Sequence, residues 1–194
     1  FHPFDGFWDL KREKRGSLRA ANILVALFVL LYGARYQLSG YCFTHARFED
    51  LNVLYGLLMM VLPLAMWIVS NWCFTSLMDG EGSFKDIYIA TAYALAPYII
   101  TAIPMLLLSH CLSGNEAFIY NTFDSIIMFW MLALIFFGMQ ITHDYSFGKG
   151  ILTGVLTLVG MCLMMFLALV CFNIGQDMIS FVRDIYTEVS YRTY

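Results

Sequence analysis

The chain has 194 residues, of which 60% are hydrophobic, 17% aromatic and only 13% charged. A soluble domain carries about 25% charged residues, and a body of this size cannot hide so many apolar side chains in its own core. The net charge of -3 gives no reason to expect a nucleic-acid partner. The composition therefore excludes an ordinary soluble domain and predicts an all-α membrane protein that lies in the lipid bilayer.

The first 19 residues form an aromatic and basic segment. Its notable side chains are those of Phe4, Phe7, Trp8, Lys11, Arg12, Lys14 and Arg15. Aromatic rings settle at the headgroup level of a membrane and basic side chains attract anionic lipid, so residues 1–19 are predicted to lie at the membrane interface. An orientation signal is the simplest role, and a docking surface for a cytoplasmic protein is the alternative. The sequence begins with Phe1 rather than Met, so the position of the natural N-terminus stays an open question.

Five apolar stretches follow, each close to the about 20 residues that cross a bilayer core. They cover residues 20–38, 51–77, 87–108, 118–141 and 151–174. Every backbone amide in lipid needs an internal partner, so all five are predicted to be helices of one transmembrane domain, residues 20–174. The first stretch lacks a small-residue cleavage site, which favours a retained span over a signal peptide. Pro63, Pro97 and Pro104 are each expected to bend their helix.

The last helix is predicted to continue beyond the membrane as an amphipathic helix over residues 175–194. Its apolar stripe consists of Ile174, Met178, Phe181, Ile185 and Val189. This helix could lie on the lipid surface or offer the stripe to a partner protein.

The distribution of basic residues predicts the orientation of the chain. Seven lysines and arginines fall on the N-terminal side of the five spans and four on the opposite side. This bias places the N-terminus in the cytoplasm and, after five spans, the C-terminus outside the cell membrane.

Two short turns on the N-terminal side resemble each other. Residues 79–85 and 144–149 both begin with an aspartate, continue through small residues and a Ser-Phe pair, and end on a lysine. The likeness suggests two similar hairpins after a lone first helix, and chance similarity is the rival explanation. Because Asp86 is expected near a helix start, the first turn is interpreted as a tight connection rather than a cation loop.

Small residues mark two helix faces that could approach neighbouring backbones closely. Alanines at positions 90, 94, 92 and 96 form two such pairs in the third stretch, and Gly150 and Gly154 form one at the head of the fifth. Packing within the chain is the favoured interpretation, and a contact between copies is the alternative.

No pattern of residues indicates an enzyme, a cofactor or a metal site. Among the few ionisable residues at membrane depth, Arg35 and Asp124 are expected near the outer face, close enough to pair. No arrangement supplies a positioned acid, base or nucleophile. Cys42 and Cys111 fall in predicted outer loops, where two free thiols and a disulfide both remain open.

The element Gly82-Ser83-Phe84-Lys85, followed by Tyr93-Ala94-Leu95-Ala96-Pro97, resembles the Ypt-interacting protein (Yip) family. The opening stretch from His2 to Lys11 is similar to the bacterial branch of that family. The resemblance implies a non-enzymatic membrane protein, and for bacterial members an association with transport systems such as sugar-importing ABC permeases. Eukaryotic members carry an Asp-Leu-Tyr-Gly-Pro element before the first span, and its absence from this sequence argues against a GTPase partner.

Two functions are compatible with these features. The first is a membrane scaffold or accessory subunit that binds another membrane protein, through its small-residue faces and amphipathic ends. The second is a small transporter or channel for a neutral or lipid-like solute, because prolines can break helices near the midplane of a bilayer.

Overall fold

The structure, a computed structural model, describes residues 3–13, 16–40 and 53–192 of the chain. All regular elements in these parts are helices. They are α1 (Pro3–Arg12), α2 (Leu18–Leu38), α3 (Val53–Leu77), α4 (Phe84–Ala94), α5 (Ala96–Cys111), the short 3₁₀ helix η2 (Gly114–Glu116), α6 (Ala117–His143) and α7 (Phe147–Arg192). The all-α prediction is confirmed.

Within the described residues, five helical stretches are long and apolar enough to cross a bilayer, as the hydropathy pattern predicted. They are Leu18–Leu38, Tyr55–Leu77, Phe84–Cys111, Gly114–His143 and Phe147–Tyr191. The third of them combines α4 and α5. Large apolar side chains on every one of these helices are exposed, which is the distribution expected of helices that face lipid.

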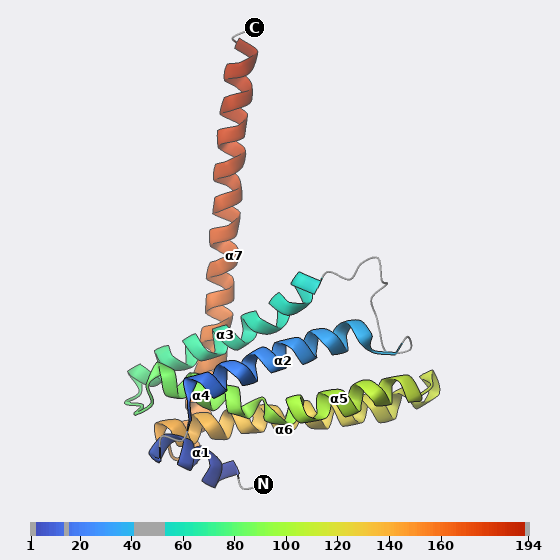
Figure 1. Cartoon of the computed structure of the whole chain (residues 1–194). Coiled ribbons are helices and arrows are strands. Elements are labelled where there is room, and N and C mark those ends of the chain that lie inside the picture. Colours follow the sequence, from blue (N-terminus) through green and yellow to red (C-terminus); the bar gives the residue numbers. More distant parts are fainter. Residues whose placement is uncertain (1–2, 14–15, 41–52, 193–194) are drawn as a thin grey trace.

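Helices α2, α3, α4–α5 and α6 run side by side as a bundle, and α1 lies across one end of it (Figure 1). We call this end, formed by α1 and the turns at residues 78–83 and 144–146, the α1 end. Helix α7 starts there, packs on α3 and α6, and leaves the bundle at a steep angle to the other helices (Figure 1). Its distant half extends well beyond them.

The centre of the bundle is apolar and lies between α2, α5 and α6. The Phe28 ring is fully buried and meets the Tyr98 ring edge-on, with 5.0 Å between the ring centroids. Ala102 and Met131 complete this cluster. Aromatic pairs in this geometry contribute about 0.5–1.5 kcal/mol beyond the area they bury.

The third span is interrupted at Leu95, and Pro97 supplies the reason. Proline has no backbone N–H, so the carbonyl of Tyr93 loses its helical partner and the ring crowds the preceding turn. The Leu95 N–H bonds to the Ala92 carbonyl instead, at 3.3 Å, in the tighter pattern of a 3₁₀ turn. Pro63 and Pro104 lie inside helices that continue through them, so only Pro97 ends a helix.

The two similar turns cap their helices in the same way. Asp79 and Asp144 both adopt the left-handed conformation, with φ of 54° and 55°. One residue later, the N–H of Gly80 bonds to the Thr75 carbonyl at 2.8 Å, and that of Tyr145 bonds to the Gln140 carbonyl at 3.0 Å. Each bond reaches back five residues, the pattern that ends many helices. The two turns therefore resemble each other in backbone conformation as well as in sequence.

Candidate functional site

Helix α1 is docked onto the bundle. The Phe7 ring is only 7% exposed and packs against Ala90 and Ala94 of α4. A Cβ atom at Gly138 of α6 would lie 3.0 Å from this ring, so the absence of a side chain at that position lets α1 approach. The Phe7 ring therefore packs within the chain, on the small residues of α4 and α6, and its place at the membrane interface stays a prediction.

The neighbouring aromatic residues of α1 do face outward. Phe4 is 52% exposed and contacts the Phe137 ring at a centroid distance of 4.8 Å, and Trp8 is 50% exposed. The interfacial role of both residues stays a prediction. Lys14 and Arg15 lie outside the described residues.

Two ion pairs tie α1 to the turns. The Lys11 ammonium lies 3.0 Å from Glu81, and the Arg12 guanidinium lies 3.2 Å from Asp144. The hydrogen bond from Lys11 holds the pKa of the Glu81 carboxyl below its usual range. Basic residues that were expected to attract lipid thus also fix the position of α1.

A buried histidine joins the two turns. His143 is 2% exposed, its Nδ1 accepts a hydrogen bond from the Gly82 N–H at 3.3 Å, and its ring stacks on Tyr145. A Cβ atom at Gly82 would come within 2.8 Å of the imidazole, so this position requires glycine. The Tyr145 hydroxyl donates to the Met78 carbonyl at 3.2 Å, and burial raises the pKa of this phenol.

Ser83 and Lys85 lie beside this contact. The Ser83 hydroxyl accepts the Asp86 N–H, and the Asp86 carboxylate accepts the Ser83 N–H, so the two residues form a reciprocal cap at the start of α4. This confirms the predicted place of Asp86 near a helix start. The Lys85 side chain is exposed.

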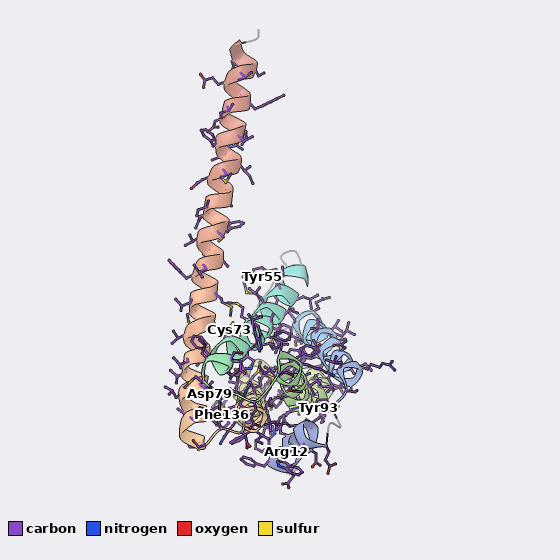
Figure 2. The ribbon with its side chains drawn as sticks, turned by 90° about the vertical axis from the view of Figure 1, so that its left-hand side faces the viewer. Arg12, Tyr55, Cys73, Asp79, Tyr93 and Phe136 are labelled. Carbon is purple, nitrogen blue, oxygen red and sulfur yellow. The ribbon has the colours of Figure 1, made fainter. Side chains whose placement is uncertain are left out.

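An apolar hollow of about 660 Å³ opens between α1, the α4–α5 junction and α6. Tyr93 and Pro97, the aromatic and proline residues of the sequence motif, both line it. Phe7 and Leu10 of α1 form one wall, and Trp130 of α6 contributes to another. Figure 2 shows Tyr93 on the side of the bundle away from α7. The motif therefore lies where a helix break borders a lipid-facing hollow.

The opposite end of the bundle holds a buried ion pair. Arg35 is 8% exposed, and its guanidinium donates to Asp124 at 2.7 Å and to the Tyr120 hydroxyl at 2.8 Å. It also lies over the Tyr98 ring, 5.2 Å from the centroid. These contacts join α2, α5 and α6, so the expected pairing of Arg35 and Asp124 is confirmed. We interpret the cluster as a connection between spans.

Helix α7 crosses α3 along a polar seam. The Ser70 hydroxyl donates to the Thr157 carbonyl at 2.7 Å, and the Asn71 amide donates to the Thr157 hydroxyl at 3.4 Å. A Cβ atom at Gly160 would overlap the Phe74 ring and the Ser70 hydroxyl. The helices therefore approach closely at Gly160, which the sequence analysis did not single out.

Gly150 and Gly154 occupy the adjacent face of α7, toward α6. A Cβ atom at Gly150 would lie 3.4 Å from Gln140, and one at Gly154 would lie 3.7 Å from the Phe136 ring. These are tight to ordinary contact distances, and both glycines face a helix of the same chain. Figure 2 shows Phe136 near the start of α7.

The remaining sequence expectations concern cysteines and metals. Cys111 is an exposed free thiol, and Cys42 lies outside the described residues. Among the residues that the structure describes, no three His, Cys, Asp or Glu side chains are grouped so as to hold a metal ion.

The fold and these contacts define an all-α integral membrane protein that combines a lipid-facing hollow with a long protruding helix. The Yip1 domain matches residues 1–169, and the chain therefore belongs to the Yip1 domain family. This result confirms the family resemblance. The matched region ends within α7, so residues 170–192 of that helix lie beyond the family domain. No curated protein and no solved structure matches the chain.

Proposed function

We propose that the chain is a non-enzymatic membrane scaffold or accessory subunit that binds another membrane protein through α7. The observation that supports this proposal best is the exposure of the apolar stripe at the end of α7. Met178, Phe181 and Ile185 are all exposed, and charged residues lie between them along the helix. Contiguous exposed apolar surface on a protein commonly marks an interaction site.

Charged residues make lipid an incomplete cover for the distant half of α7, a helix of 46 residues. Asp177, Arg183 and Asp184 interrupt the apolar surface of the distant half, so this half belongs outside the core. An amphipathic helix of this kind binds a hydrophobic groove of a partner through side chains spaced three and four residues apart.

A matched pair of substitutions tests the proposal. Ile185 lies on the stripe and Ile179 lies off it, and both are exposed. Ile185→Asp should abolish recovery of a partner chain when the protein is purified in its native lipid, because a charge enters the contact. Ile179→Asp should leave recovery largely intact. Recovery of the lone chain from the unsubstituted protein, under conditions that preserve other membrane complexes, would contradict the proposal, and recovery of a second copy would replace it with self-association.

We extend the proposal to the identity and orientation of the assembly. The opening stretch from His2 to Lys11 favours the bacterial branch of the family, for which an ABC-type permease is the partner that the resemblance suggests. The bias of lysine and arginine supports a cytoplasmic N-terminus and an external C-terminus in the cell membrane.

One observation favours the alternative function of a small transporter or channel for a neutral or lipid-like solute. The third span breaks at Leu95 beside the hollow that Pro97 lines, and broken helices form substrate sites in many transporters. Flux of labelled solutes into liposomes that contain the purified chain tests this function. The absence of flux for sugars, amino acids and lipid analogues alike would exclude it.

A further inference from the structure

We propose that the α1 end holds a specific phospholipid with an ammonium-bearing zwitterionic headgroup, of the phosphoethanolamine class. Two hollows of opposite character meet at α1 and share Phe7 and Leu10 as a common wall. One is mostly apolar, with Asp9 as its one charged lining residue among the described residues, and the other is lined by charged groups of both signs. A molecule with an apolar tail and a charged head matches this pair, and the site does not depend on which protein α7 binds.

The apolar hollow suits an acyl chain. Its volume of about 660 Å³ lies within the roughly 300–1,000 Å³ range of small-molecule sites. Ile100 and Trp130 stand at its rim with much of their surface exposed, so the hollow opens toward lipid rather than toward the core. Pro97 lines the hollow too, next to the break of the third span at Leu95.

The second hollow, of about 440 Å³, presents charges of both signs. Lys11, Lys85 and Asp86 line it. Glu81 offsets the charge of Lys11 at 3.0 Å, whereas Lys85 has no ion-pair partner among the described residues. Asp86 uses one carboxylate oxygen, Oδ2, to accept both donors of Ser83. Its Oδ1 accepts no hydrogen bond within the described chain.

The charges that line the second hollow indicate which class of lipid headgroup it binds. One available ammonium and one available carboxylate oxygen leave little net charge for a purely anionic lipid to neutralise. They complement a headgroup whose phosphate accepts from Lys85 and whose primary ammonium donates to Asp86. A choline headgroup carries no N–H donor and cannot make the second contact. Exposed aromatic rings such as those of Phe4 and Trp8 favour the headgroup level of a bilayer, which supports a headgroup site beside α1.

Quenching of Trp130 fluorescence tests the proposal. The variant W8F/W67F/W72F keeps Trp130 as the only tryptophan of the four, and it is placed in nanodiscs of phosphatidylcholine. Phosphatidylethanolamine with brominated acyl chains should quench Trp130 at about one tenth of the concentration that brominated phosphatidylcholine or phosphatidylglycerol requires, because a hydrogen bond to a charged group is worth about a factor of ten or more.

Matched substitutions identify the headgroup contact. Lys85→Gln should raise the half-quenching concentration of the brominated ethanolamine lipid about tenfold, because it removes the phosphate contact. Lys149→Gln is the control, since this lysine lies over the Tyr145 ring at the same end and lines neither hollow. Equal quenching by the three lipids, or equal behaviour of the two lysine variants, would overturn the proposal.

Native mass spectrometry of the unsubstituted protein gives a second measurement that needs no tryptophan replacement. Stepwise removal of lipid should leave one phosphatidylethanolamine bound after phosphatidylcholine and phosphatidylglycerol have dissociated. Lys85→Gln should release it together with the others. Retention of no lipid, or retention of all three classes alike, would refute the site.

Discussion

The contact at Gly160 provides a quantitative test of how α7 is held. In the Gly160→Ala variant, the new methyl group overlaps the Phe74 ring and the Ser70 hydroxyl, so α3 and α7 must separate. Overpacking of this kind is destabilising by roughly 2 kcal/mol. Separation also weakens two interhelical hydrogen bonds, from Ser70 and Asn71 to Thr157, at about 0.6 kcal/mol each in a membrane protein.

The intrinsic preference of alanine for helices offsets about 1 kcal/mol of that loss. The net destabilisation is therefore about 2 kcal/mol, or roughly a thirtyfold decrease in the folding equilibrium constant. Reversible unfolding in mixed micelles with increasing dodecyl sulfate, followed by circular dichroism, measures this free energy of unfolding.

The same helix supplies two controls. A Cβ atom at Gly154 would meet its neighbours at 3.7–3.9 Å, and one at Gly175 would meet nothing within 4 Å. Gly154→Ala and Gly175→Ala should therefore be neutral or stabilised by up to about 1 kcal/mol. If Gly160→Ala were as stable as either control, the close crossing of α3 and α7 would be refuted.

Three further outcomes follow from the ion pairs and the turns. Asp124→Ala leaves the Arg35 guanidinium buried without its carboxylate and should lower the free energy of unfolding by about 2 kcal/mol. Loss of one partner of a fully buried pair costs about 3–5 kcal/mol, and the loss here is smaller because a third of the Asp124 side chain is exposed. The double variant R35M/D124L should recover most of that loss in the same micelle assay. The pKa of Glu81 is lowered in the folded state, so the stabilisation from its ion pair with α1 is complete at neutral pH and is lost as the pH falls through that lowered pKa. The protection factors of the α1 amides, which correct for the pH dependence of intrinsic exchange, should fall in acid, and Glu81→Gln should show the low protection already at neutral pH. Unchanged protection in that variant would exclude the tether. In chains with a single cysteine, a membrane-impermeant thiol reagent added to intact cells should label Cys111 and spare Gly148→Cys, and the reverse pattern would invert the proposed orientation.

Hydropathy alone predicted the five spans because the bilayer, rather than detailed packing, determines where apolar helices of this length can exist. The cap at Ser83 was also readable, since a serine followed three residues later by an acid is a common helix start. The sequence analysis used only Asp86 and passed over its partner.

Tertiary contacts explain what the sequence did not reveal. In the sequence, Phe7 resembles the other aromatic residues of the first segment. In the structure, its ring packs between Ala90 and Gly138, which lie far apart along the chain. Gly82 was selected as a residue of the sequence motif. The structure shows that a side chain at this position would overlap the ring of His143, which lies 61 residues away in the sequence. Three prolines were expected to act alike, and only Pro97 interrupts its span. One signal was available and missed, namely the run of small residues at positions 153, 157 and 160 that forms the α7 seam.

Photocrosslinking from α7 in living cells tests the proposed function most directly. A photoreactive residue in place of Met178 lies on the exposed stripe, and one in place of Phe129 lies on the exposed face of α6. The account predicts a discrete adduct with another integral membrane protein from position 178 and adducts with lipid alone from position 129. Lipid adducts alone from both positions would contradict the claim that α7 binds a partner.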